Sequence, residues 1–84
     1  MKNDAEIAAE IRLVIARQLR VALQTLSDDK HLVYDLGADS LDFFDLGIEL
    51  ENMFGLVFDE SDIVSMNTVG DVVARVLDGI GAAR

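Results

Sequence analysis

One serine stands out as a group on which chemistry could take place. Ser40 lies between Asp39 and Asp42, at the point where a loop passes into a predicted helix. The first turn of a helix has unpaired backbone N–H groups and the positive end of the helix dipole, and both favour a covalently attached phosphate. The alternative is that Asp39 or Ser40 only caps the helix, which is the usual role of these residue types at such a position.

The sequence offers no catalytic partners for this hydroxyl. Asp39 and Asp42 are weak bases, and His31 is the single histidine and lies in a predicted loop, so we assign it no role. A chain without cysteine forms neither a disulfide nor a thiolate metal site. The acidic residues lack the spacing of an EF-hand, and no glycine-rich phosphate loop is present. The serine is therefore interpreted as a site that another enzyme modifies.

The charge distribution restricts the partners. Seven Lys and Arg against sixteen Asp and Glu give a net charge of −9, which repels nucleic acid and anionic membranes. No Lys or Arg lies between Lys30 and Arg75, an interval rich in Asp and Glu, so we expect basic partners. No apolar run is long enough for a membrane span, and the N-terminus lacks the pattern of a signal peptide. We therefore expect a cytoplasmic monomer without membrane insertion.

Hydrophobic periodicity predicts an all-α fold, a small antiparallel four-helix bundle formed by residues 1–84 as a single domain. Three longer helices are expected, over about 4–19, over about 40–54 with Gly55 as the stop, and from Thr68 to a fraying tail. The short third helix follows Asp59. Residues 21–38 are expected to form a long, apolar-anchored loop, which Gly37 redirects into the second helix. Arginines 12, 17 and 20 are interpreted as a solvated face.

The predicted second helix carries a narrow acidic strip beside Ser40. At 3.6 residues per turn, Asp42, Asp45, Glu49 and Asn52 fall on one arc, bordered by apolar residues, while the remaining surface is apolar apart from Glu51. Like charges one turn apart destabilise a helix, so an unmixed strip favours a docking surface over a plain solvated face. The predicted partner-recognition residues, including the acid before Ser40, are Asp39, Leu41, Asp42, Asp45, Ile48 and Glu49.

Residues 35–42, Asp-Leu-Gly-Ala-Asp-Ser-Leu-Asp, resemble the attachment motif of the acyl carrier protein family of bacterial type II systems. The likeness covers nearly the whole chain, including residues 51–56 and 68–71. It implies that a phosphopantetheinyl transferase joins 4′-phosphopantetheine to Ser40 through a phosphodiester. The thiol of this arm would carry acyl groups as thioesters, and the carrier itself would be non-catalytic. The implied partners are the transferase and the basic patches of fatty-acid or lipid synthases and acyltransferases, with the acyl chain sheltered between the helices.

The chain departs from the usual family pattern in three respects. It has no proline, although the family often has one where Asp59 stands, so we expect a looser start of the third helix. Phe43 and Phe44 follow the motif where smaller residues are more usual. Gly47 lies mid-helix, where glycine costs about 1 kcal/mol relative to alanine. Either Gly47 accommodates Phe43 one turn earlier, or these three residues reshape the acyl cavity of a specialised carrier, for example one for the very long acyl chains of lipid A.

Two other functions share some of these features. A carrier for aminoacyl, peptidyl or polyketide groups would have the same serine and the same bundle. A helical interaction module would use Ser40 only as part of a helix start and would never be modified. The cargo distinguishes the first alternative from an acyl carrier, and modification of Ser40 distinguishes the second.

Overall fold

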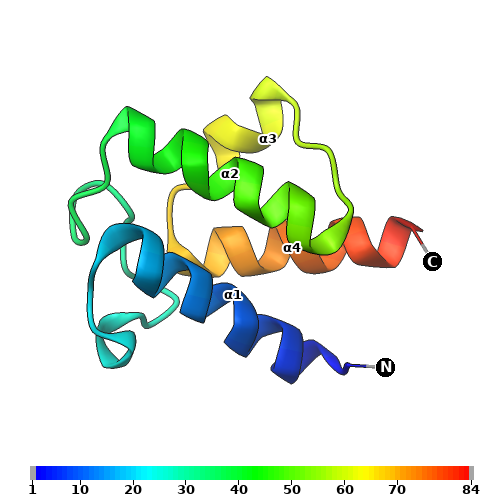
Figure 1. The fold of residues 1–84 in the computed structure, drawn as a ribbon, viewed down its shortest axis with the longest axis horizontal. Coiled ribbons are helices and arrows are strands. Elements are labelled where there is room, and N and C mark those ends of the chain that lie inside the picture. The colour runs from blue at the N-terminus through cyan, green and yellow to red at the C-terminus, as the bar shows by residue number, and fades with distance from the viewer. Residues whose placement is uncertain (1, 84) are drawn as a thin grey trace.

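The computed structural model describes residues 2–83, and within them it is helical (Figure 1). Its α-helices are α1 (Asp4–Leu19), α2 (Ser40–Phe54), α3 (Glu60–Ser65) and α4 (Val69–Ala83), and a short 3₁₀ helix, η1, spans Leu23–Thr25. No strand is formed in this part of the chain, where a single isolated antiparallel bridge joins His31 to Thr68. The expected all-α fold, with a long loop after α1 and a short third helix, is confirmed.

All four helices begin with the same local arrangement. Asn3, Asp39 and Asp59 cap α1, α2 and α3, each accepting the N–H of the third helical residue, whose side chain accepts the N–H of the cap in return. At α4, Thr68 Oγ1 accepts from the Asp71 N–H at 3.1 Å, and Asp71 Oδ2 accepts from the Thr68 N–H at 3.0 Å. Asp59 thus caps α3 at the place where the family often has proline, and the looser start expected there stays a prediction.

The helix ends also follow local chemistry. Gly55 ends α2 in the left-handed conformation at φ 66°, and its N–H donates to Glu51 O, as expected from the sequence. By contrast, α4 continues through Gly79 and Gly81 to Ala83 without a break. Arg84, at the end of the predicted fraying tail, lies outside the described residues.

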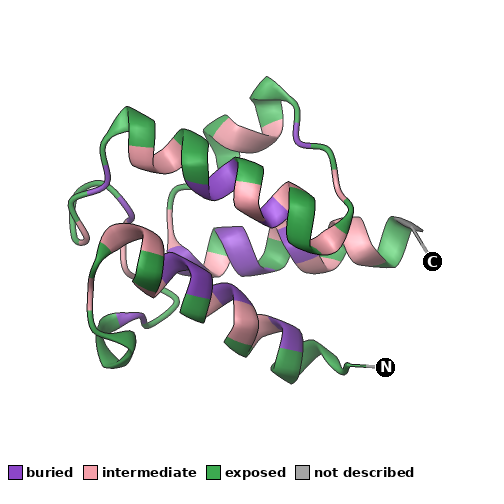
Figure 2. Ribbon diagram, viewed as in Figure 1, coloured by how far each residue is buried: buried purple, intermediate pink, exposed green. Residues whose placement is uncertain are grey.

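The core lies between α1, α2 and α4. Figure 2 shows the buried faces of these three helices turned towards one another. The long loop contributes buried side chains too, as expected for an apolar-anchored loop: Leu26, Leu32 and Ala38. No residue of α3 is buried, although the half-buried Ile63 packs against the core. The largest fully buried side chains are Ile11, Val14, Ile15, Leu32, Leu50, Val69, Val72 and Val76.

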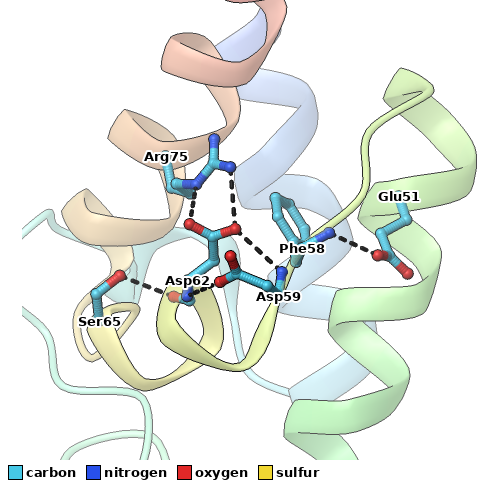
Figure 3. Close-up of polar contacts among 6 residues, drawn as sticks. All are labelled: Glu51, Phe58, Asp59, Asp62, Ser65 and Arg75. Atoms are coloured by element: carbon cyan, nitrogen blue, oxygen red, sulfur yellow. Dashed lines mark hydrogen bonds and ion pairs between the residues drawn. The ribbon is translucent and has the colours of Figure 1, made fainter.

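A polar link fastens α3 to α4 (Figure 3). Arg75 Nε donates to Asp62 Oδ1 at 2.8 Å, and Arg75 Nη2 donates to Asp62 Oδ2 at 3.1 Å. The Arg75 guanidinium also lies 5.4 Å from the centre of the Phe58 ring, whose backbone N–H donates to Glu51 Oε2 at 2.7 Å. The hydrogen bonds from Arg75 lower the pKa of Asp62 to about 2. Since no residue of α3 is buried, apolar packing holds this helix only weakly. The hydrogen bonds between Asp62 and Arg75 therefore matter for its attachment to α4.

Candidate functional site

Ser40 is the first residue of α2, and its side chain is exposed. The capping role belongs to Asp39, whose Oδ1 accepts from the Asp42 N–H at 2.8 Å, while Asp42 Oδ2 accepts from the Asp39 N–H at 3.2 Å. Among residues 2–83 the Ser40 hydroxyl makes no hydrogen bond. The helix therefore does not need this hydroxyl, which stands free at the positive end of the helix dipole.

The turn before α2 places Ser40 at the surface. Gly37, which was expected to redirect the chain into the second helix, has a φ of 74°, and a side chain in this left-handed conformation would be strained. Ala38 is buried, and its N–H donates to Leu32 O at 2.9 Å. The buried Ala38 anchors the chain to the core, and Asp39 starts the helix. Ser40 follows directly and is exposed to solvent.

An apolar hollow of about 540 Å³ opens beside Ser40, between the loop, α2 and α3. Phe43 is half-buried and packs against the core, whereas Phe44 is 61% exposed, yet both line the hollow. Both phenylalanines thus lie beside Ser40, and the contributions of the loop and of α3 to the hollow were not predicted from the sequence. The lining residues are Val33, Ala38, Asp39, Ser40, Phe43, Phe44, Ile63, Val64 and Asn67.

Gly47 lies one helical turn beyond Phe43 and is buried. A Cβ at this position would meet no atom within 4 Å, including any atom of the Phe43 side chain. The explanation that Gly47 is small in order to accommodate Phe43 is therefore wrong. Instead, the space beside this glycine is unfilled.

Two carboxylates of the acidic strip are engaged within the protein. Glu49 Oε1 accepts from Arg17 Nη2 at 2.8 Å, and Asp42 is engaged with Asp39. Asp45 is exposed, and within the described residues it has no ion-pair partner. Leu41 is 68% and Ile48 41% exposed. We call Leu41, Asp45 and Ile48 the docking patch. Among the predicted recognition residues, these three are exposed and take part neither in the helix cap nor in an ion pair within the described residues.

Two of the three arginines of α1 are paired rather than merely solvated. Arg17 reaches Glu49 across 32 positions of sequence, and Arg12 pairs with Asp28 in the loop. The interpretation of these two residues as a plain solvated face was incomplete, because the packing of α1 against α2 and against the loop brings opposite charges together. Arg20 is exposed and ends α1 with a φ of 58°.

Replacing Asp39 with alanine is expected to destabilise the fold by about 1 kcal/mol, the usual cost of losing an N-cap. The loss follows because the Asp42 N–H, now bonded at 2.8 Å, would have no side-chain acceptor. Urea unfolding of the unmodified protein measures the change. Asp39→Asn retains an acceptor and should stay close to the original stability; equal losses in both variants would contradict the capping role.

Comparison with known proteins decides the family. Residues 9–76 match the family described as a phosphopantetheine attachment site. An acyl carrier protein of Thermotoga maritima is 35% identical over 81 residues, which cover 96% of this chain and 100% of the relative. This chain belongs to the acyl carrier protein family. An acyl carrier protein of Campylobacter hominis is 37% identical over 71 residues, covering 84% of this chain and 90% of that protein.

The fold of this carrier protein agrees with a solved relative. The structure of a proposed acyl carrier protein from Mycobacterium tuberculosis superposes with a TM-score of 0.80 at 36% identity, covering 86% of this chain and 96% of that one. Acyl carrier proteins are non-catalytic carriers, and the matched domain contains their phosphopantetheine attachment site. No helix among residues 2–83 is long and apolar enough to cross a membrane.

The residues present fit 4′-phosphopantetheine. The exposed Ser40 hydroxyl is unengaged, and the start of α2 offers backbone N–H groups and a positive dipole for a phosphodiester. When bound, the group supplies a thiol, which this cysteine-free chain lacks. The apolar hollow beside Ser40 provides a surface for an apolar cargo.

Proposed function

We propose that this carrier protein transports acyl groups for fatty-acid or lipid biosynthesis on 4′-phosphopantetheine attached to Ser40 Oγ. The observation that carries the proposal is the division of roles at the start of α2, where Asp39 caps the helix and Ser40 is left exposed without a hydrogen bond in the described chain. The carrier would act in the cytoplasm as a monomer, with residues 1–84 as one carrier domain.

Three features of the site support this function. The backbone N–H groups and dipole of α2 would offset the negative charge of a phosphodiester placed between Asp39 and Asp42. The hollow lined by Phe43 and Phe44 would shelter an acyl chain, since burying each methylene contributes about 0.8 kcal/mol. The docking patch combines one free carboxylate with two apolar side chains, which suits a basic, partly apolar surface on the transferase or a synthase. Charge complementarity of this kind favours rapid encounter more than high affinity.

The attachment site can be tested by intact-protein mass spectrometry. The protein is incubated with coenzyme A and a phosphopantetheinyl transferase of broad specificity, and we expect one phosphopantetheinyl mass gain. Ser40→Ala should abolish the gain, and Ser61→Ala should retain it, since Ser61 is another exposed serine in the first turn of a helix. No gain in the original protein, or a gain that survives Ser40→Ala, would refute the proposal. Cargo identified on protein from its native source separates acyl from aminoacyl, peptidyl or polyketide carriers.

We further propose that the carrier serves very long acyl chains, such as those used in lipid A. The support is the unfilled space beside the buried Gly47, one turn beyond Phe43 and therefore farther from Ser40. A chain that enters the hollow and passes Phe43 would find room there. Retaining a mid-helix glycine without a steric need favours such a role, because glycine costs helix stability.

Gly47→Ala is expected to stabilise the unmodified protein by about 1 kcal/mol, because alanine is the better helix former and its Cβ would meet no atom within 4 Å. Gly47→Val fills more of the space and should weaken the protection of very long chains against hydrolysis more than that of shorter ones. Urea unfolding and the hydrolysis rates of loaded chains of different length measure the two effects. Better protection of ordinary chains in the original protein, together with no change in Gly47→Val, would contradict the specialisation.

A further inference from the structure

His31 has a defined place in the fold that the carrier function does not explain. It is half-buried in the loop before Ser40, and its backbone forms the isolated bridge with Thr68 at the start of α4. Leu32 N–H donates to Asn67 O at 2.9 Å, and Val69 N–H donates to Lys30 O at 3.0 Å. These backbone hydrogen bonds hold His31 against the start of α4. The position from which its side chain extends is therefore fixed.

The imidazole of His31 caps the turn that follows it. Nδ1 accepts from the N–H groups of Val33 and Tyr34, each at 3.1 Å, and Asp35 Oδ2 accepts from the His31 N–H at 2.7 Å. These are the positions that an Asn, Asp or Ser cap would serve at a helix start. The Tyr34 ring lies 4.3 Å from the imidazole at an interplanar angle of 32°, which restrains the ring. To accept both bonds, Nδ1 must carry its lone pair, so the proton of the neutral ring lies on Nε2.

The capped turn leads directly to Ser40. The N–H groups of Asp35 and Leu36 donate to His31 O at 2.9 and 3.1 Å, and Gly37 N–H donates to Val33 O at 3.0 Å. The turn closes where Ala38 N–H donates to Leu32 O, and Asp39 and Ser40 follow at once. Val33, whose N–H the imidazole accepts, also lines the hollow beside Ser40.

We propose that His31 is a positioning residue for the modification of this carrier. Its Nδ1 holds the turn over residues 31–38 in the conformation that presents the Ser40 hydroxyl to the transferase and keeps Val33 in the wall of the hollow. The inference rests on the proposed attachment at Ser40. It assigns to an imidazole a structural task that usually belongs to a hydroxyl, carboxylate or amide side chain.

Three substitutions at one position test the inference. In His31→Asn the amide oxygen lies where Nδ1 does, so the cap is rebuilt. His31→Gln is the matched control, because its amide lies one bond farther from the backbone, near the place of Nε2, and cannot replace Nδ1. His31→Ala has no side-chain acceptor at all. Hydrogen exchange at the Val33 and Tyr34 amides reports the cap, and kcat/KM for phosphopantetheinyl transfer reports the presentation of Ser40.

We expect His31→Asn to keep the amide protection and the loading rate of the original protein. His31→Gln and His31→Ala should lose protection at these two amides and load about fivefold more slowly. A fivefold change corresponds to about 1 kcal/mol, the usual cost of losing one cap. Exchange of core amides such as that of Leu50 should stay unchanged, which separates the effect from general unfolding. Loading of the Gln and Ala variants at the original rate would overturn the inference, as would slow loading of His31→Asn with its amides protected. If the original protein is not loaded at all, the proposed function fails and this inference falls with it.

Discussion

Asp45→Lys is expected to lower kcat/KM for the proposed loading of Ser40 by about tenfold at low ionic strength, within the range by which electrostatic steering changes association rates. Asp45 is the exposed carboxylate of the docking patch, and it lies between Leu41 and Ile48 on α2. Of the neighbouring carboxylates, Asp42 bonds to the Asp39 N–H and Glu49 to Arg17. Asp39 and Asp42 keep their negative charge, since a backbone N–H does not neutralise a carboxylate, but Asp45→Lys places a positive charge between the two apolar residues of the docking patch.

A salt series and a distant charge reversal provide the controls. The effect should shrink towards 1 M salt, where the Debye length falls to about 3 Å from about 10 Å at 0.1 M. Asp4→Lys makes the same change in net charge at the start of α1, which lies at the opposite end of the bundle from the start of α2 (Figure 1). It should leave loading almost unchanged. Equal slowing by both variants would show that only net charge matters, and an effect that persists at 1 M salt would exclude steering.

Arg75→Met is expected to lower the Tm by about 5 °C at neutral pH. The substitution removes both hydrogen bonds to Asp62, while the methionine stem retains part of the packing against Phe58. Because no residue of α3 is buried, few other contacts compensate for the loss. Thermal unfolding of the unmodified protein, followed by circular dichroism, measures the change.

The pair of Arg75 and Asp62 should also make the Tm depend on pH. The hydrogen bonds from Arg75, followed by the one from the Asp59 N–H, lower the pKa of Asp62 from its ordinary value of 3.8 to about 2. A carboxylate with a lowered pKa in the folded state stabilises the fold fully above its ordinary pKa, and this contribution is lost as the pH falls through about 2. Arg75→Met should therefore flatten the decline of the Tm between about pH 4 and about pH 2.

Arg12→Met is the matched control for Arg75→Met. Arg12 also pairs with an aspartate, but the Asp28 side chain is 67% exposed, and such surface pairs contribute little. Its Tm should stay close to the original at every pH. An equal loss in both variants, or an Arg75→Met curve parallel to the original between about pH 4 and about pH 2, would contradict the role assigned to the link between α3 and α4.

The bounds of the helices were predictable because their signals are local. Each cap and its reciprocal partner lie three residues apart, as in Asn3 with Glu6, so the sequence contains the whole interaction. Gly37 and Gly55 likewise act through their own backbone conformation. Local signals limited the cap of α2 to Asp39 or Ser40, and the structure assigns it to Asp39.

The remaining features depend on contacts that no local pattern contains. Arg17 meets Glu49 only because α1 and α2 pack side by side, and Arg75 meets Asp62 only because α3 folds back on α4. The role of His31 depends on two backbone N–H groups that converge on Nδ1 once the turn has formed. A histidine is an uncommon cap, so its residue type carried no signal. The space at Gly47 depends on what the other helices leave unfilled.

The aspartate that caps α3 in place of proline has a consequence for how the chain folds. No proline occurs in the sequence, so the unfolded chain contains no X–Pro bond, whose isomerisation takes tens of seconds. Helical contacts are mostly close in sequence, which favours folding within milliseconds. After an opening event or release from a chaperone, the protein should refold in one rapid phase. A prolyl isomerase would not be needed to restore a Ser40 that can be loaded.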